Sequence, residues 1–181
     1  MKTNRMKYTI FLIAVLNAAL TTCKLETDPA NDVDPITALV VRVSDGDTIR
    51  VVERKPGYES SSAGGQRFGI KVRVWGIDAP ELRQGFGRQA RDALASRIHK
   101  RIVRVKSHGK DRYGRVLGEV YLGQVNVNAW MVEKGYAWAY VRYTNKFASR
   151  MLKARKAKVG LWSRPAKAPW AWRRDNRYAR N

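Results

Sequence analysis

Short β-branched runs and polar breaks alternate through the first part of the chain. Residues 36–43 and 48–52 are rich in Val, Ile and Thr, and they flank an Asp-Gly dipeptide, which favours tight turns between strands. A loop-like stretch with Gly and Ser occupies residues 55–65, and apolar and basic residues then alternate in residues 68–77. These patterns predict a hairpin followed by a third strand.

A helical period replaces this pattern after residue 87. Ala90, Leu94 and Ile98 recur at every fourth position, which places them on one face of an amphipathic helix over residues 88–101. Strand character then returns on both sides of a turn with two glycines. The three segments are residues 102–106, 109–114 and 116–122.

Two further helices are expected in the last third of the chain. Asn126 is placed to cap a helix that ends before Gly135, and Asn145 is placed to cap one that ends at Gly160. The predicted order is three strands, a helix, two strands and two helices with a short strand between them. This order favours an α+β fold, mainly β, in which a five-stranded barrel carries about three packed helices.

Charge narrows the classes of function. The chain has 181 residues, of which 36 are Lys or Arg and 15 are Asp or Glu, so its formal net charge is +21. Residues 142–181 hold 13 basic residues and a single acid, Asp175. A surface this cationic attracts polyanions, so nucleic acid and anionic lipid headgroups are the expected partners. The composition excludes a neutral cytosolic enzyme of average charge.

The N-terminal segment has the pattern of an export signal. Three basic residues precede an uncharged apolar run at residues 8–20, which is too short for a permanent membrane span. Cys23 follows Leu-Thr-Thr, which resembles a bacterial lipoprotein box, so either lipidation of Cys23 or ordinary cleavage nearby is possible. We therefore expect residues 1–23 to be a signal peptide, residues 24–35 a linker, and the protein to be secreted or in the bacterial cell envelope.

Four of the acidic residues fall in two tight clusters, Asp45 with Asp47 and Asp78 with Glu81. Clustered carboxylates repel one another unless a cation lies between them, and Ca²⁺ and Mg²⁺ prefer carboxylate and carbonyl oxygens. A plainer interpretation makes Asp45 a turn former and Asp78 the end of a strand. The clusters therefore predict a divalent cation site only together with other residues.

Two arginines supply that context. Arg73 lies five residues before Asp78, and Arg115 follows the two-glycine turn. Guanidinium groups bind phosphate oxygens with paired hydrogen bonds, and charge accumulates on those oxygens during phosphoryl transfer. A metal, a carboxylate base and two arginines together indicate phosphodiester hydrolysis.

Several motifs in order along the chain resemble the thermonuclease, or staphylococcal nuclease, family. The matching stretches are Val43–Thr48, Val72–Glu81, Asp111–Arg115, Val127–Gly135 and Gly160–Ser163. The resemblance implies an OB-fold barrel with helices over residues 36–164. It also implies calcium-dependent cleavage of DNA and RNA that leaves 3′-phosphate ends, by a protein that we expect to be a monomer without an obligate protein partner.

The same resemblance implies roles for single residues. Asp47 and Asp78 match the carboxylates that bind one Ca²⁺, and Ala79 matches a position that offers a backbone carbonyl, where Thr is the common residue. Glu81 matches the carboxylate regarded as general base. The plainer alternative for Glu81 is an acid at a helix N-terminus.

Four further positions match substrate-binding residues. Arg73 and Arg115 match two phosphate-binding arginines, although Arg73 could also be a solvent-facing strand residue. Tyr113 and Tyr143 match tyrosines that contact phosphate or pack on the base. A second tyrosine on the base side aligns either with Tyr140 or with Val141.

Residues 165–181 form a basic tail rich in Trp and Arg that extends past the resemblance. It could be a solvated cationic end or an added contact to nucleic acid or an anionic surface. Two rival functions also stay open: a non-catalytic OB-fold module that binds nucleic acid, and an adhesion protein of the cell envelope.

Overall fold

The computed structural model describes residues 35–54 and 69–178. The predicted signal peptide with Cys23, nearly all of the predicted linker and the loop at residues 55–65 lie outside the described residues. Within the described ranges, no helix is both long and apolar enough to cross a membrane.

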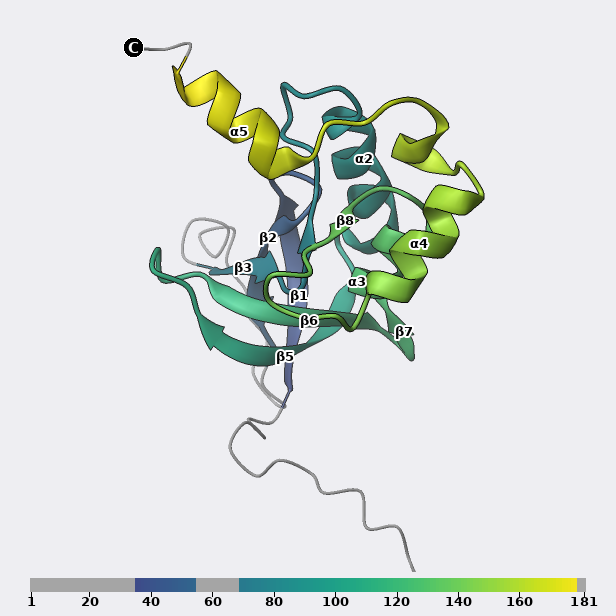
Figure 1. Cartoon of the computed structure of the whole chain (residues 1–181). Helices are drawn as coiled ribbons and strands as arrows, with labels where there is room; N and C mark the ends of the chain where they lie inside the picture. Colours follow the sequence, from purple (N-terminus) through teal and green to yellow (C-terminus); the bar gives the residue numbers. More distant parts are fainter. Residues whose placement is uncertain (1–34, 55–68, 179–181) are drawn as a thin grey trace, which may run out of the picture. The chain divides into compact units, whose positions relative to one another are not determined.

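Five strands form a closed barrel, which confirms the predicted fold class (Figure 1). They are β1 (Ile36–Val43), β2 (Thr48–Glu53), β3 (Ile70–Val74), β5 (Ile102–Lys110) and β6 (Val116–Leu122). Neighbours in the order β3-β2-β1-β5-β6 pair antiparallel. Parallel pairing of β3 with β6, with Val74 opposite Gly118, closes the barrel.

Alternate residues of the barrel strands fill its interior, as the period of two predicts. The buried hydrophobic residues on these strands are Ala38, Val40, Ile49, Val51, Val72, Val74, Val103, Val105 and Val120. Gly118 leaves room for this packing, because a Cβ there would lie 2.7 Å from Cγ1 of Val72 and of Val105. The closing strand therefore needs a glycine at this position.

Two helices pack on the barrel strands, and a third packs on the second of these helices. They are α2 (Gly87–Ile98), α3 (Val127–Glu133) and α4 (Ala148–Lys156). The predicted stripe of α2 is confirmed, since Ala90, Leu94 and Ile98 are fully buried. The predicted cap of α3 is confirmed too: Asn126 accepts the backbone N–H of Ala129 through its side chain at 2.9 Å.

The predicted cap of α4 is wrong. The N-cap residue is Phe147, and Asn145 contributes only its backbone carbonyl, which accepts the N–H of Ala148. Phe147 is 1% exposed and contacts Trp75 edge-on, so core packing decides where the helix begins. Tertiary burial here outweighs the local preference of Asn for a cap.

The remaining described elements are short, with one exception. They are β4 (Ile77–Asp78), β7 (Val125–Asn126), β8 (Trp138–Ala139), the 3₁₀ helix η2 (Gly160–Ser163) and the helix α5 (Pro169–Tyr178). β4 pairs with β8. α5, drawn in yellow in Figure 1, lies in the segment expected to be a tail, so the described residues hold four α-helices rather than about three.

Candidate active site

The two acidic clusters meet in space. Asp47 lies in the turn before β2, and its Oδ2 accepts the backbone N–H of Ala79, directly after Asp78, at 2.6 Å. A Cβ on Gly46 would lie 2.6 Å from Cβ of Ala79 and 2.9 Å from that of Ala90, so the turn can approach this closely only with glycine there. The hairpin turn and the end of β4 thereby form one surface.

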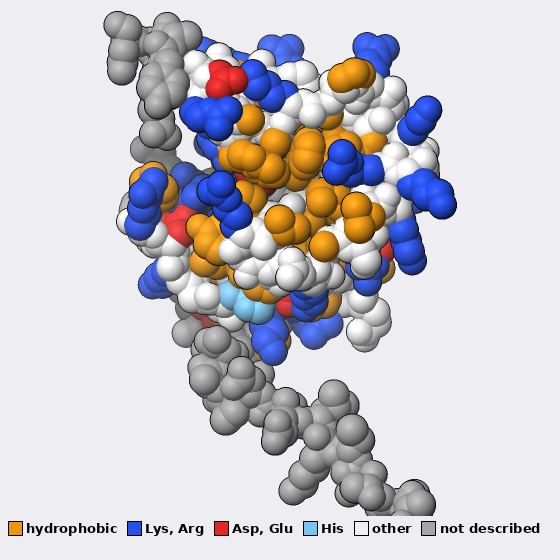
Figure 2. All heavy atoms as spheres, viewed as in Figure 1, with side chains coloured by type: hydrophobic (Ala, Val, Ile, Leu, Met, Phe, Trp, Pro, Cys, Tyr) orange, Lys and Arg blue, Asp and Glu red, His pale blue; other side chains and the backbone are white. Residues whose placement is uncertain are grey.

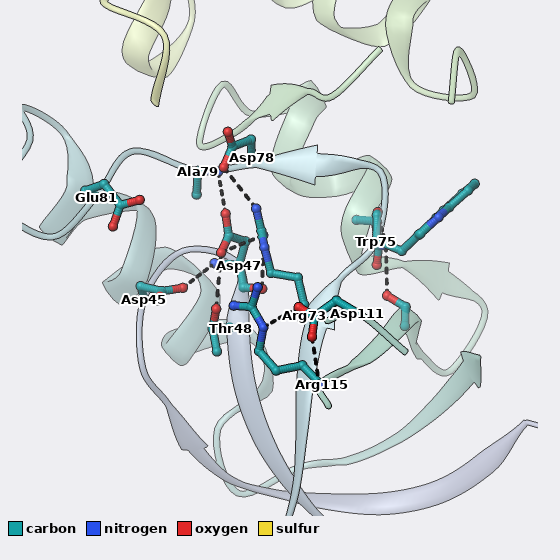
Figure 3. A network of polar contacts seen from close by, with 12 residues as sticks. Asp45, Asp47, Thr48, Arg73, Trp75, Asp78, Ala79, Glu81, Asp111 and Arg115 are labelled. Atoms are coloured by element: carbon teal, nitrogen blue, oxygen red, sulfur yellow. Dashed lines mark hydrogen bonds and ion pairs between the residues drawn. The ribbon is translucent and has the colours of Figure 1, made fainter. Parts of the chain in front are cut away.

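Arg73 lies between the two aspartates (Figure 3). Its Nη1 is 2.6 Å from Oδ1 of Asp47, and its Nη2 is 2.9 Å from Oδ1 of Asp78. Burial raises the pKa of Asp47 to about 6 although Arg73 opposes the shift, and burial also raises the pKa of Asp78. Burial lowers the pKa of Arg73, but the two aspartates outweigh it and the pKa is raised overall. Two buried carboxylates therefore share one arginine.

Asn128 fixes the turn that connects Arg73 to Asp78. It is fully buried on α3, donates from Nδ2 to the carbonyl of Trp75 at 2.8 Å, and accepts the N–H of Val120 at 3.0 Å. Sequence reasoning did not single out Asn128. A polar residue on the apolar face of a short helix was the available signal.

Arg115 is held by Asp111 across the turn between β5 and β6. Nε of Arg115 donates to Oδ2 of Asp111 at 2.6 Å, while Oδ1 accepts the backbone N–H groups of Tyr113 and Arg115 at 2.9 and 3.0 Å. Figure 3 shows both side chains beside Arg73. Asp111, which sequence reasoning had placed only in the family motif, thus fixes both the turn and the guanidinium.

A single pocket of about 730 Å³ brings all of the predicted site residues together. They are Asp47, Arg73, Asp78, Ala79, Glu81, Tyr113, Arg115 and Tyr143. Asp45 also lines the pocket, and its Oδ1 accepts the N–H of Asp47 at 3.0 Å, as expected of a turn former. The geometry therefore supports treating these residues as one site.

Aromatic side chains line the pocket beside the arginines. Tyr113 and Tyr143 are 68% and 72% exposed, and the guanidinium of Arg115 lies 5.6 Å from the ring centre of Tyr113. Tyr140 also lines the pocket, whereas Val141 does not line it. Of the two alternatives for the second base-side residue, the geometry favours Tyr140.

Arg173 of α5 enters the same pocket, and sequence reasoning missed it. Its Nη1 donates to Oε1 of Glu81 at 2.8 Å and to Oδ1 of Asp78 at 3.1 Å, and its Nη2 donates to Oδ2 of Asp78 at 2.7 Å. Pro169 at the first helical position was a signal for α5. No local pattern indicated which arginine of the basic segment would reach the acids.

By donor type the site fits a hard divalent cation. Asp47, Asp78 and Glu81 offer carboxylate oxygens of the kind that Ca²⁺ prefers. Among the residues that the structure describes, no three His, Cys, Asp or Glu side chains gather as a ready metal site. Arg73 joins Asp47 to Asp78 and Arg173 joins Asp78 to Glu81, so the chain's own guanidinium groups supply the positive charge.

Basic side chains are frequent on the surface of the protein (Figure 2). Figure 2 shows Lys and Arg side chains spread over one face with few acidic ones among them, in keeping with the net charge of +21. The barrel, the helices on it and the pocket of acids and arginines define an OB-fold protein equipped for phosphodiester chemistry.

Comparison with known proteins agrees with this class. The family model described as staphylococcal nuclease homologue matches residues 71–164. A protein of Escherichia coli named ParB is 42% identical over 157 residues, which cover 78% of this chain and 81% of that protein. A micrococcal nuclease of Shigella flexneri is 42% identical over 156 residues, covering 78% and 83%. An uncharacterized endonuclease of Escherichia coli is 40% identical over 138 residues, covering 74% and 82%. The chain belongs to the staphylococcal nuclease family.

Proposed function

We propose that this protein is a calcium-dependent nuclease that hydrolyses phosphodiester bonds of DNA and RNA with little sequence specificity and leaves 3′-phosphate ends. The observation that carries the proposal is the pocket in which Asp47, Asp78, Glu81, Arg73 and Arg115 come together. A module that only binds nucleic acid would need the basic surface but not three acids gathered with two arginines in one pocket.

The two arginines would hold the scissile phosphate. Each guanidinium can donate two parallel hydrogen bonds to phosphate oxygens, which become more negative in the transition state. Arg115 is pre-positioned by Asp111, and Arg73 by the two aspartates. Because neither side chain has to be ordered when substrate binds, stabilisation is directed at the reacting phosphate.

Glu81 would accept the proton of the attacking water. Its carboxylate is 36% exposed, so water can reach it, unlike the buried Asp47 and Asp78. Calcium held by Asp47, Asp78 and the backbone carbonyl of Ala79 would supply Lewis-acid stabilisation of the phosphate charge. Because Ala79 would contribute only main-chain oxygen, its departure from Thr leaves the donor in place.

Low sequence specificity would follow from the aromatic side chains. Tyr113, Tyr140 and Tyr143 line the pocket, and stacking on an aromatic ring tolerates any base. DNA and RNA are therefore both expected as substrates.

The test is cleavage of single-stranded DNA and of RNA by the purified protein in Ca²⁺ and in EGTA, beside Glu81→Gln. We expect cleavage only with Ca²⁺, products whose 3′ ends become extendable by a polymerase after phosphatase treatment, and loss of turnover by about 10²-fold or more in Glu81→Gln. Binding of the substrate without cleavage under every divalent ion would instead indicate a binding module.

We also propose that the protein is exported and that Cys23 carries a lipid if the lipoprotein box is used. Support comes from the basic, apolar and small-residue order of residues 1–23. Mass spectrometry of the N-terminal peptide from host membranes distinguishes a lipidated Cys23 from ordinary cleavage. An intact residue 1 in the mature protein would contradict export.

A further inference from the structure

α5 is docked on the active-site side of the fold by contacts at its start. Trp170 is half-buried, and its ring centre lies 5.4 Å from that of Trp138 and 5.7 Å from that of Tyr140, which lines the pocket. Just before the helix, the carbonyl of Lys167 accepts Nε2 of Gln84 at 2.7 Å. These contacts place the next turn of α5 over the acids.

Arg173 uses that position to cover two of the three carboxylates. Both oxygens of Asp78 and one oxygen of Glu81 lie within 3.1 Å of its two terminal nitrogens. Oδ1 of Asp78 also accepts from Arg73, so both oxygens of Asp78 have arginine donors. The hydrogen bonds to Asp78 and Glu81 raise the pKa of Arg173, against the effect of burial, so the group stays cationic.

A divalent cation needs the same oxygens. Ca²⁺ binds carboxylate oxygens at about 2.3–2.6 Å, closer than the guanidinium nitrogens lie now. Nη1 of Arg173 bridges Asp78 and Glu81, so a Ca²⁺ that bound Asp78 on this side would have to take the place of the guanidinium, and the two positive charges repel each other. Binding of one therefore requires the release of the other.

We propose that Arg173 is a built-in competitor of the divalent cation, so that docked α5 holds the active site in a closed state that metal binding must open. The inference rests on the proposed function, because it takes Asp78 as a metal ligand. It goes beyond that function by making α5, which lies past the family match at residues 71–164, a control element of the site.

Exposure of the contact makes the exchange feasible. The Arg173 side chain is 38% exposed and Glu81 is 36% exposed, so water reaches the guanidinium and screens its ion pair with Glu81, whereas its other partner, Asp78, is 1% exposed. A released guanidinium can stay at the pocket opening while Trp170 keeps the start of α5 in place. Arg173 is thus a displaceable group rather than a permanent partner of Asp78.

The neighbouring Arg174 offers a matched control. It is 67% exposed, and the contact that the structure gives it is an ion pair with Asp175 on the same helix. Replacing Arg174 or Arg173 by Gln removes the same unit of charge from the same turn of α5. Only the replacement of Arg173 removes a guanidinium from Asp78 and Glu81.

The experiment is calorimetric titration of the protein with Ca²⁺ in the absence of nucleic acid, for the unchanged chain, Arg173→Gln and Arg174→Gln. We expect the Kd for Ca²⁺ to fall about tenfold in Arg173→Gln, and to change by less than about twofold in Arg174→Gln. Arg173→Lys keeps the charge but loses the fork, so its Kd should lie between those of Arg173→Gln and the unchanged chain. Circular dichroism without calcium establishes that each variant is folded.

Equal affinity of Arg173→Gln and Arg174→Gln would overturn the proposal while leaving calcium binding intact. Weaker binding by Arg173→Gln would also overturn it, since Arg173 would then position the carboxylates for the metal. If none of the chains bound Ca²⁺, the calcium dependence of the proposed function would be wrong, and the competition with it.

Discussion

Burial of Asp47 should make the metal-free protein more stable in mild acid than at neutral pH. The residue is 7% exposed, and burial raises its pKa from 3.8 to about 6. In the unfolded chain the carboxyl is in water and has its ordinary pKa. The folded state therefore binds this proton more tightly, and protonation favours folding.

The size of the effect follows from the two pKa values. The stabilisation is fully present below pH 3.8 and is lost as the pH rises through about 6. Relative to its value at pH 7, the free energy of unfolding should be higher by about 1 kcal/mol at pH 5 and by about 2 kcal/mol at pH 4, with a limit of about 3 kcal/mol. Burial acts on Asp78 in the same direction, so it adds to the gain.

Other carboxylates change the free energy of unfolding only at lower pH. Against the effect of burial, hydrogen bonds from Arg115 and from Lys146 lower the pKa of Asp111 and of Glu119. Their stabilisation is present above their ordinary pKa values, 3.8 and 4.5, and is lost only as the pH falls through the lower folded values. The window between about pH 5 and 7 therefore reports the buried aspartates.

The assay is urea unfolding in EGTA between pH 7 and pH 5. In Asp47→Asn, whose side chain cannot titrate, the free energy of unfolding should lose most of its dependence on pH. Saturating Ca²⁺ should reverse the sign of that dependence in the unchanged chain, because metal and proton compete for the same carboxylates. A free energy of unfolding that stays constant or falls from pH 7 to pH 5 in EGTA would refute the reasoning.

Three further predictions concern the positioning of the site. Arg115→Lys keeps the charge but loses the paired donors, so kcat should fall by about 10²-fold while the melting temperature shifts little. Unchanged kinetics would exclude Arg115 from phosphate binding. Asp111→Asn keeps an acceptor for the turn but not for Nε of Arg115, so kcat should fall about 10- to 100-fold in steady-state assays, and an unchanged kcat would show that the clamp is dispensable. Gly46→Ala should lower both activity and the free energy of unfolding, the latter by about 1–3 kcal/mol in urea, because its Cβ would meet that of Ala79. Gly85→Ala, whose Cβ would meet nothing within 4 Å, is the control, and an equal loss in both variants would contradict the steric explanation.

The barrel could be predicted because the alternation of buried and exposed residues along each strand is visible in the sequence. Val72 and Val74 point into the core, so the period of two assigns the intervening Arg73 to the other face, where it reaches Asp47. The stripe of α2 follows from its period in the same way. The site residues within these segments were therefore available from sequence as soon as the family motifs were recognised.

Contacts between distant segments could not be predicted in this way. Arg173 lies 95 residues from Asp78, and its position depends on how Trp170 packs against Trp138 and Tyr140. Local sequence shows several arginines beside tryptophans without indicating which one faces inward. The cap of α4 failed for a related reason, since burial of Phe147 rather than the chemistry of Asn145 sets the start of that helix.

The surplus of positive charge connects these observations. Asp47 and Asp78 are almost completely buried, and in a chain with a net charge of +21 the nearest available counter-ions are its own arginines. Arg73 meets both acids, and Arg173 meets the one that Arg73 satisfies only at Oδ1. On the proposed competition, a cation that enters this pocket replaces Arg173 at Asp78, and its affinity is set by the difference between the two interactions. On that proposal, the basic composition that attracts a polyanionic substrate to the surface would also set the concentration of metal at which the site opens.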